Sequence, residues 1–405
     1  MNRIILLIPC AAAAFATSNS VPAKPTYSKD VAPILNARCV ECHRKGEIAP
    51  MTFTNYKEVR PWAKAIKAKV VARTMPPWFA DHKFGHFEND RYLSDREVAV
   101  LSAWADSGAA EGNLKDLPTA PAFEEGWQIG KPDAVIYLDK EVDVPAAGTI
   151  EYQYYTVDPG FSEDKWIQVS EIRPGNKAVV HHVIVYIQEP GKTDAAPGRG
   201  LREKLSGYAP GEQPKAYPDG VAKLVKAGSK FVFQMHYTTN GTAAKDRSYM
   251  GVKFAKGPVK QRALTGMAVN ASFAIPAGAD SHEVKSSWVA KEDVRIVDLM
   301  PHMHVRGKDF KYTAVYPDGR EEVLLSVPKY DFNWQLLYQP KGGGYALPKG
   351  TRLECVAHFD NSPNNKFNPD PAKVVKWGPQ TWEEMMIGWF DYVVQKENLS
   401  ATGGL

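Results

Sequence analysis

The sequence predicts a multidomain chain in which a small all-α domain precedes two all-β antiparallel sandwiches. Residues 24–115 carry apolar side chains at helical spacing, whereas the chain from about residue 120 carries short alternating runs with turn residues between them. Helical patterns are nearly absent from this second part, and its length of roughly 280 residues suits two sandwiches better than one. We therefore expect an all-α domain over 24–115 and sandwiches over 116–275 and 276–400.

Length and charge limit the classes of partner. The chain has 405 residues and a formal net charge of +4, which is small for this length. No polybasic block or aromatic stacking platform accompanies the charge, so we expect no nucleic-acid partner. No segment after the N-terminus approaches the length of an apolar membrane span, so we also expect no transmembrane segment.

The N-terminus has the pattern of a secretory signal peptide over residues 1–23. A basic start and a short apolar stretch lead to Ala14-Phe15-Ala16, which suits a small-residue cleavage site, and cleavage after Ala23 is a second option. Cys10 raises the question of lipidation, but Pro9 is unsuited to the position before a lipidated cysteine. The pattern indicates a periplasmic or secreted protein.

Three short helices are expected in the first domain. In residues 26–39, TYSKDVAPILNARC, Val31, Ile34 and Leu35 share one helix face. Residues 60–73 form a second helix with a lysine-rich solvated face. The third covers 94–108, where Ser94 and Glu97 predict a capping box and Gly108 a C-terminal cap.

A haem attachment motif follows the first of these helices. Residues 38–44 read RCVECHR, so Cys39 and Cys42 could form thioethers to haem c while His43 coordinates its iron. A zinc half-site would need a second ligand pair nearby, and apart from Cys10 in the expected signal peptide no other cysteine lies within 300 residues. A thioredoxin-like pair would need a βαβ context, but the surroundings are helical. Three short helices around C-x-x-C-H resemble the cytochrome c fold.

The sixth haem ligand is expected on the loop that reads RTMPPWFADHKFGHF. Met75, followed by two prolines, resembles the methionine loop of small cytochromes c. Met51 is a rival that packing explains better. His82 and His86 are more typical of surface residues, although His82 stays a minor candidate.

The β-rich part contains several strand patterns and one hairpin signal. The segments EYQYYTV, KWIQVSEI, VVHHVIVYIQ and KFVFQMHY alternate as strands do, and Tyr316-Pro317-Asp318-Gly319 predicts a hairpin turn. The Pro/Gly-rich stretch from Glu189 to Gly220 is expected to be a long insertion beside a site.

Five of the ten histidines fall in three of these strand-type segments. They are His181 and His182, His236 in QMHY, and His302 and His304 in LMPHMHVRG. Because residues i and i+2 of a strand point to one face, His302 and His304 can converge on one metal. The adjacent His181 and His182 can do so only at a strand end or twist, or through different ring nitrogens. Imidazoles suit copper or zinc, and a thioether favours copper(I).

The order of these motifs resembles the copper type II, ascorbate-dependent monooxygenases, which include peptidylglycine α-hydroxylating monooxygenase and dopamine β-monooxygenase. The match runs from HH through QMHY and H-x-H to the methionine of TWEEMMIGWFDY, over residues of about 120–395. The resemblance implies two jelly-roll sandwiches with one copper each, facing across a solvent-filled cleft. It assigns His181, His182 and His236 to the electron-transfer copper. His302, His304 and Met385 would hold the copper that binds and activates dioxygen, with Met386 as the alternative.

Three positions depart from this family. Met300 stands where the peptide-hydroxylating enzyme has the arginine that binds the substrate carboxylate, and Trp389 stands where it has a substrate-binding tyrosine. A glycine-extended peptide is therefore a poor candidate for the substrate. The family disulfide joins a strand like LECVAHF to the residue after the methionine ligand. Here Cys355 remains, but Met386 stands at the position of its partner, so the bridge cannot form and we expect Cys355 to be a buried free thiol.

The combined motifs lead to one functional hypothesis and one alternative. The first is an exported oxidoreductase with one covalent haem c and two coppers per chain, which hydroxylates a C–H bond of an unknown small-molecule or peptide-like substrate with dioxygen. The haem domain would supply electrons, with an external electron donor upstream. The alternative is a non-catalytic periplasmic electron-transfer protein that carries haem c and bound copper.

Overall fold

A computed structural model describes residues 21–123, 126–192 and 203–402 of the chain. The signal peptide, with Cys10 and the Ala14-Phe15-Ala16 site, lies outside the described residues except for its last three positions. The chain divides into two compact units. One comprises Met1–Pro76 with Leu93–Ala120, and the other comprises Pro77–Tyr92 with Pro121–Leu405.

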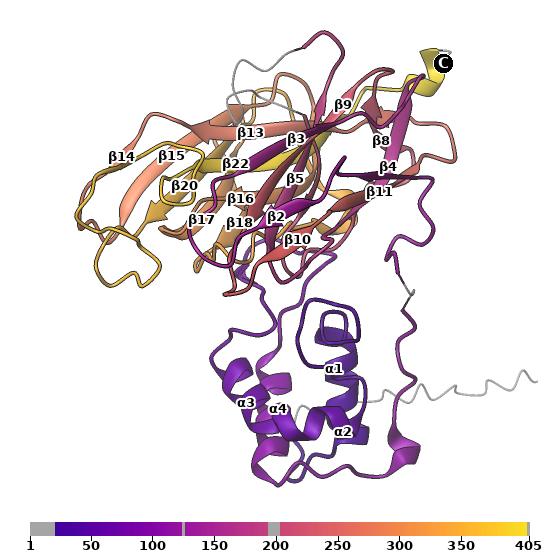
Figure 1. Cartoon of the computed structure of the whole chain (residues 1–405), viewed down its shortest axis with the longest axis vertical. Coiled ribbons are helices and arrows are strands. Elements are labelled where there is room, and N and C mark those ends of the chain that lie inside the picture. The colour runs from indigo at the N-terminus through magenta and orange to yellow at the C-terminus, as the bar shows by residue number, and fades with distance from the viewer. Residues whose placement is uncertain (1–20, 124–125, 193–202, 403–405) are drawn as a thin grey trace, which may run out of the picture. The chain divides into compact units, whose positions relative to one another are not determined.

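The first unit is helical (Figure 1). Its helices are α1 (Ala32–Arg38), α2 (Tyr56–Val59), α3 (Ala63–Val71) and α4 (Asp95–Asp106), with a π-turn at Tyr27–Val31 and 3₁₀ turns at Arg60–Trp62 and Leu114–Asp116. Their apolar faces enclose one core, in which Leu35, Leu101 and Trp104 are fully buried. The three expected helices are present.

The ends of α4 follow local capping rules. The Ser94 side chain accepts from the Glu97 backbone N–H, and the Glu97 carboxylate accepts from the Ser94 backbone N–H, which confirms the capping box. Gly108 follows the helix with φ of +96°, a left-handed conformation that glycine adopts without steric cost.

The boundary of the helical unit differs from the sequence expectation. The segment Pro77–Tyr92 leaves the helical unit and belongs to the β unit, although it lies within the expected 24–115 domain. It is bound there by backbone hydrogen bonds from Asp81 N–H to the Ser326 carbonyl and from Glu88 N–H to the Gln339 carbonyl, both 2.8 Å. The aromatic ring of Trp78 packs on Tyr338, with centroids 4.9 Å apart. Local sequence could not predict this, since the contacts span more than 200 residues.

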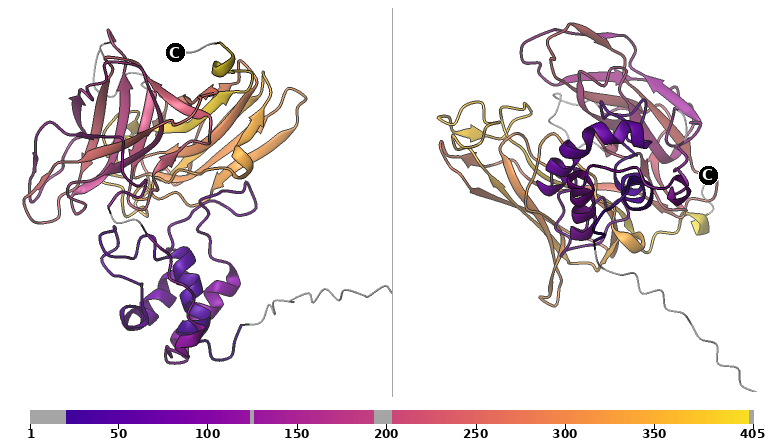
Figure 2. Two further views of the ribbon diagram at one scale, coloured as in Figure 1. Left: turned by 90° about the vertical axis from the view of Figure 1, so that its right-hand side faces the viewer. Right: turned by 90° about the horizontal axis from the view of Figure 1, so that it is seen from below.

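The β unit contains two sandwiches, each with its own core (Figure 2). The strands of the first are β1 (Ala134–Tyr137), β2 (Val142–Val144), β3 (Gln153–Val157), β4 (Lys165–Arg173), β5 (Val180–Gln188), β6 (Glu203–Tyr208), β7 (Lys215–Ala216), β8 (Val221–Val225), β9 (Lys230–Tyr237), β10 (Ala244–Asp246), β11 (Tyr249–Phe254) and β12 (Gln261–Arg262). One sheet has the order β1-β11-β4-β8-β12, with β7 paired to β4, and the other has the order β3-β9-β5-β6. Side chains from both sheets, among them Val183, Phe233 and Met250, share a buried core.

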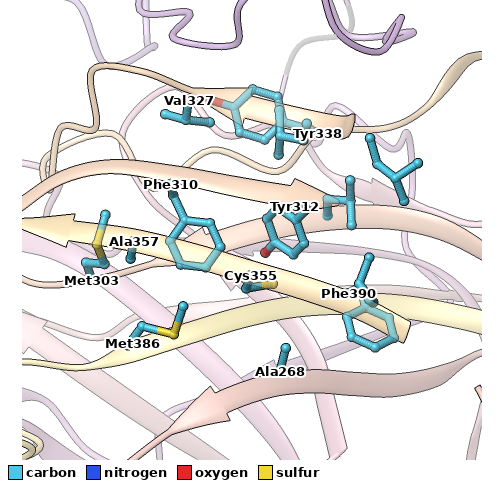
Figure 3. Close-up of a cluster of buried hydrophobic side chains, with 14 of the residues drawn as sticks. Ala268, Met303, Phe310, Tyr312, Val327, Tyr338, Cys355, Ala357, Met386 and Phe390 are labelled. Atoms are coloured by element: carbon cyan, nitrogen blue, oxygen red, sulfur yellow. The ribbon is translucent and has the colours of Figure 1, made fainter. Parts of the chain in front are cut away.

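The second sandwich follows the same plan. Its strands are β13 (Leu264–Asn270), β14 (Ala274–Ile275), β15 (His282–Val289), β16 (Val294–His302), β17 (Gly307–Val315), β18 (Glu321–Val327), β19 (Tyr345–Leu347), β20 (Arg352–Phe359), β21 (Val375–Lys376) and β22 (Met386–Val394). The sheets β13-β22-β16-β19 and β15-β20-β17-β18 pack their inner faces together. Figure 3 shows this core, with Tyr312, Cys355 and Phe390 inside it.

The strand predictions are confirmed, and one loop prediction is corrected. The expected segments form β3, β4, β5 and β9, and Tyr316–Gly319 turns between β17 and β18, with Gly319 at φ of +86°. The stretch from Glu189 to Gly220 is not one long insertion: beyond the undescribed residues 193–202 it forms β6, which pairs with β5, and β7. Alternation within β6 was too short to detect in a Pro/Gly-rich context.

Cys355 is a buried free thiol, as expected. Its side chain is fully buried, and no disulfide links any of the described cysteines. Met386 is fully buried in the same core (Figure 3). Burial raises the pKa of the thiol, so Cys355 behaves as an apolar core residue.

A buried charged network joins the two sandwiches. Lys215 on β7 contacts Asp391 on β22 at 2.5 Å and Asp298 on β16 at 3.1 Å. Lys223 on β8, which has no exposed surface, lies 3.4 Å from Asp391, and Tyr217 donates to the same carboxylate. Although burial acts to raise it, the ammonium groups of Lys215 and Lys223 hold the pKa of Asp391 well below its usual value.

We expect Asp391→Ala to destabilise the β unit strongly. The substitution leaves two buried ammonium groups short of a counter-charge, and removing one partner of a buried ion pair costs about 3–5 kcal/mol. Urea denaturation followed by tryptophan fluorescence measures this loss. Glu141→Gln, which removes an exposed partner of Lys245, is the matched control and should leave the midpoint almost unchanged. Equal midpoints for the two variants would contradict a stabilising role of the network.

None of the described helices has the length and apolarity needed to cross a membrane.

Candidate metal centre

A β-bulge brings the first three histidines together. In the β5–β9 ladder, Val180 pairs with Tyr237 and His182 pairs with His236, so His181 is an extra residue on its strand. A bulge re-aims the side chain of the inserted residue, and adjacent residues can then point to one side. This resolves how His181 and His182 share a site within one strand.

The nitrogen atoms of this set are spaced as ligands of one ion. Nδ1 of His182 lies 3.1 Å from Nδ1 of His181 and 3.3 Å from Nδ1 of His236. Two nitrogens bound to one tetrahedral ion at 2.0–2.1 Å lie roughly 3.3–3.4 Å apart. Nε2 of His181 lies 3.2 Å from the Asn333 side-chain oxygen. That oxygen accepts a hydrogen bond from Nε2–H, which leaves Nδ1 free to bind metal.

Burial keeps these imidazoles uncharged. His182 and His236 are 2% and 5% exposed, and burial is the main cause that lowers the pKa of both well below the usual value. Nε2 of His182 is buried without a hydrogen-bond partner. A metal ion binds the neutral form of imidazole, so a cluster that is already neutral does not have to lose protons before it binds metal.

The second set lies at the end of β16. His302 and His304 point to one side of the strand with ring centroids 5.3 Å apart, while Met303 between them points into the core. Both rings are buried, at 4% and 0% exposure. Burial lowers the pKa of His302 to about 4 and that of His304 to about 3, so both are neutral at physiological pH.

Hydrogen bonds fix which nitrogen each of these rings presents. Nδ1 of His302 donates to the Gln335 side-chain oxygen at 2.7 Å, and Nδ1 of His304 donates to the Glu383 carbonyl at 3.1 Å. Each ring therefore keeps Nε2 as its lone-pair nitrogen. Nε2 of His304 is buried and has no hydrogen-bond partner, which suits a metal ligand.

Strand register puts Met385 on the same face as this pair. His302 pairs with Ile387 across the β16–β22 ladder, and Met385 precedes Ile387 by two residues, so its side chain shares that face. It packs with Met300 and Trp389, which are themselves cross-strand partners. The alternative, Met386, faces the opposite core, as Figure 3 shows. The arrangement favours Met385 over Met386 as the thioether of this set.

We expect Gln335→Leu to weaken copper binding at the His302/His304 set about 10–100-fold, since a group behind a metal ligand fixes its tautomer and orientation. Competition with a copper(I) chelator measures the affinity. Gln168→Leu, which changes a half-exposed glutamine bonded to Asp219, is the control. Unchanged affinity in Gln335→Leu would show that Gln335 does not orient His302.

Two aromatic rings contact both histidine sets. Tyr152 lies 4.7 Å from His236 and 6.2 Å from His304, centroid to centroid. Phe332 stacks on His181 at 5.0 Å and lies 6.0 Å from His304. Tyr152 and Phe332 therefore each pack against rings of both sets. The charged network around Asp391, which holds the sandwiches together, supports this close packing.

The C-x-x-C-H residues lie in a turn after α1. The His43 ring stacks on Phe53 with centroids 4.2 Å apart, and its Nδ1 lies 3.2 Å from the Met51 carbonyl. The carbonyl can accept only from Nδ1–H, which leaves Nε2 free to coordinate iron. Neither Cys39 nor Cys42 forms a disulfide with another described cysteine, and burial raises the pKa of Cys39 to about 12. This donor set fits covalent haem attachment.

The candidates for the sixth ligand lie on both units. Met75 is half-buried near the end of the first segment of the helical unit. Met51 packs against the helical core, and its carbonyl is occupied by His43. His82 and His86 belong to the segment of the β unit, where His82 stacks on Tyr92 at 4.9 Å. Met75 remains the prediction.

Several residues that contact the two histidine sets were not predicted as site residues from the sequence. These are Tyr152, Asn333, Gln335, Phe332, Thr381 and Glu384. Each reaches the histidines only through the tertiary fold, although Thr381 and Glu384 stand in the TWEEMMIGWFDY segment that carries the methionine. The one signal that could have found any of them is the position of Thr381 and Glu384 shortly before Met385.

No family model and no curated protein sequence matches the chain. Among solved structures, the neighbours include PNGF-II in a C2 crystal form, with a TM-score of 0.29, 9% identity, and coverage of 76% of this chain and 71% of that one. They also include the VP2 subviral particle of infectious bursal disease virus, with a TM-score of 0.18, 8% identity, and coverage of 68% and 83%. Likeness at this level carries no argument about fold or function.

Proposed function

We propose that this protein is an exported, copper-dependent monooxygenase that carries a c-type haem domain. The observation that supports this most is the presence of five neutral, mostly buried imidazoles in two sets, each with ring nitrogens oriented for metal. The same feature has a cost, since Nε2 of His182 and Nε2 of His304 are buried without hydrogen-bond partners, and such groups destabilise a fold. Buried imidazoles that lower the stability of the fold are more consistent with a role in metal binding than with a role in core packing.

The two sets would take different roles. His181, His182 and His236 would hold a copper through three nitrogens. His302, His304 and Met385 would hold a second copper, where a weak thioether suits copper(I). Copper at such sites supplies one-electron chemistry toward dioxygen. Gln335 and the Glu383 carbonyl orient the second pair, while Tyr152 and Phe332 keep water from the space between the sets.

The surroundings of Met385 favour an apolar substrate group. Met300 and Trp389 pair across the ladder beside it, and Leu337 packs against both. The buried cation Lys204 contacts the Met300 sulfur at 2.6 Å. This composition supports a C–H bond in an apolar part of the substrate.

The helical unit would act as the electron inlet. Cys39 and Cys42 would bind haem c covalently and His43 would coordinate its iron, with Met75 as the expected sixth ligand. Three chain crossings, after Pro76, Tyr92 and Ala120, join the helical unit to the β unit. Tethering of this kind raises the effective concentration of a redox partner to about the millimolar range without a tight docking surface.

One observation favours a non-catalytic electron carrier as the second candidate. His304 has no exposed surface, and His302 and Met385 are 4% and 8% exposed. A metal enclosed to this degree would exchange electrons more readily than it would bind a bulky substrate. The rate at which reduced, copper-loaded protein is oxidised by dioxygen distinguishes the two candidates. A monooxygenase consumes dioxygen at the second set, so removing that set slows oxidation. An electron carrier is oxidised at the same rate with or without the second set.

Metal analysis with visible spectroscopy tests the proposal as a whole. We expect one haem c and two coppers per chain in copper-reconstituted protein. Protein that holds zinc, or no metal, at both histidine sets would overturn the monooxygenase proposal. Protein that contains haem c but no copper would support only the assignment of a c-type cytochrome.

A further inference from the structure

One short loop contacts both histidine sets. It runs from Gln380 to Met385 and leads into β22. The loop is compact: the Glu383 carboxylate accepts from the Gln380 backbone N–H at 3.0 Å and packs against Gly378, where a Cβ would lie 2.0 Å from it. The Gly378 backbone N–H donates to the Glu384 carbonyl at 3.1 Å. We name this segment the 380–385 loop.

Its first residues contact the His181/His182/His236 set. The Thr381 hydroxyl lies 3.3 Å from Nε2 of His236. Because Nδ1 of His236 faces the other two rings, Nε2 must carry the proton when Nδ1 binds a metal, and the hydroxyl oxygen can accept it. The Gln380 side-chain oxygen accepts from the backbone N–H of Tyr152 at 3.1 Å, and Tyr152 packs on His236.

Its last residues contact the His302/His304 set. The Glu383 carbonyl accepts from Nδ1 of His304. The buried Glu384 carboxylate accepts from the backbone N–H groups of His304 at 2.8 Å and Arg306 at 2.7 Å. The next residue is Met385, the candidate thioether ligand.

The loop is also fixed to the core of the second sandwich. Arg306 is 1% exposed, and its Nη1 donates to the Trp382 carbonyl at 3.0 Å while its Nε donates to Asn361 at 2.9 Å. A loop held at this many points has little freedom to shift at one end alone. A change at one end is therefore transmitted to the other.

We propose that the 380–385 loop couples the two metal sites, so that copper at one set raises the affinity of the other. Thr381 is the positioning residue on the first set, and the Glu383 carbonyl with Met385 acts on the second. Metal at either set acts on the same six fixed residues, so a loop position set by the first metal also places the groups that orient the second set. Such coupling is reciprocal by thermodynamic necessity. It rests on the metal-binding part of the proposed function and not on the reaction.

The test measures copper(I) affinity at the first set by chelator competition, with full-length protein. The second set is either intact or removed by His304→Ala. We expect the intact second set to raise affinity at the first about 5–150-fold, the range typical of coupling between sites. Thr381→Val should lower first-set affinity about 10–100-fold and abolish the difference. Thr381→Ser, which keeps the hydroxyl, should restore both.

Two further measurements separate coupling from general damage. Thr351→Val changes a buried threonine whose hydroxyl has no hydrogen-bond partner, and it should alter neither affinity. The copper(II) EPR hyperfine splitting of the first set should shift in Thr381→Val and return in Thr381→Ser. First-set affinity that is the same with and without His304 would overturn the coupling while leaving the monooxygenase proposal intact. Absence of copper from both sets of the unaltered protein would overturn both.

Discussion

His302→Ala is expected to leave one copper per chain where the unaltered protein holds two. Its ring nitrogen is one of only two imidazole donors in the second set, and the remaining His304 and Met385 are too few to retain copper(I) against a chelator. The loss should exceed the roughly 10–100-fold typical of groups behind a ligand. Plasma mass spectrometry of dialysed protein measures the copper, and the haem absorbance should be unchanged.

His282→Ala is the matched control for this substitution. His282 opens β15 and is half-exposed, and it takes no part in either set. That variant should retain both coppers. Two coppers in His302→Ala would show that the second set does not hold metal, and loss of both would show that the residue supports the fold of the whole β unit.

Removing copper is expected to slow oxidation of the haem by dioxygen at least about tenfold, which corresponds to about 1.4 kcal/mol in the barrier. The inlet model passes electrons from the helical unit into the β unit, where dioxygen is consumed. Fully reduced protein is mixed with dioxygen in a stopped-flow instrument, and the haem absorbance is followed. The copper-loaded form should be fast, and the copper-free form and His302→Ala should be slow.

The control for this experiment is the His282→Ala protein loaded with both coppers. It should oxidise its haem as fast as the unaltered protein. Equal rates with and without copper would show that the haem reacts with dioxygen directly and that the two centres are not coupled. The metal-binding assignments would survive that result, but the inlet role of Cys39, Cys42 and His43 would not.

Local patterns predicted the elements well. Apolar spacing at Val31, Ile34 and Leu35 predicted a helix whose buried face these three residues form. Alternation predicted β5 and β9, because one face of each strand lies against a core. Periodicity of this kind depends only on which side of an element is buried, so a single sequence records it.

The spacing of the H-x-H motif likewise predicted that His302 and His304 share a face. Whether the adjacent residues His181 and His182 share a site was harder to predict. A regular strand forbids a shared site, and only the bulge in the β5–β9 ladder permits it. A bulge arises from the pairing of two strands that lie about 50 residues apart, so neither strand encodes it alone.

The sequence by itself determined the helical and β-rich parts of this chain, the C-x-x-C-H motif and the candidate ligands on strands. Tertiary structure alone decided three matters: that Pro77–Tyr92 belongs to the β unit, that Tyr152 and Phe332 contact both histidine sets, and that the 380–385 loop touches each. The physical reason is the range of the interactions. Helix and strand patterns reflect burial of neighbouring residues, whereas these contacts join segments up to about 250 residues apart, and their partners are set by how the sheets pack.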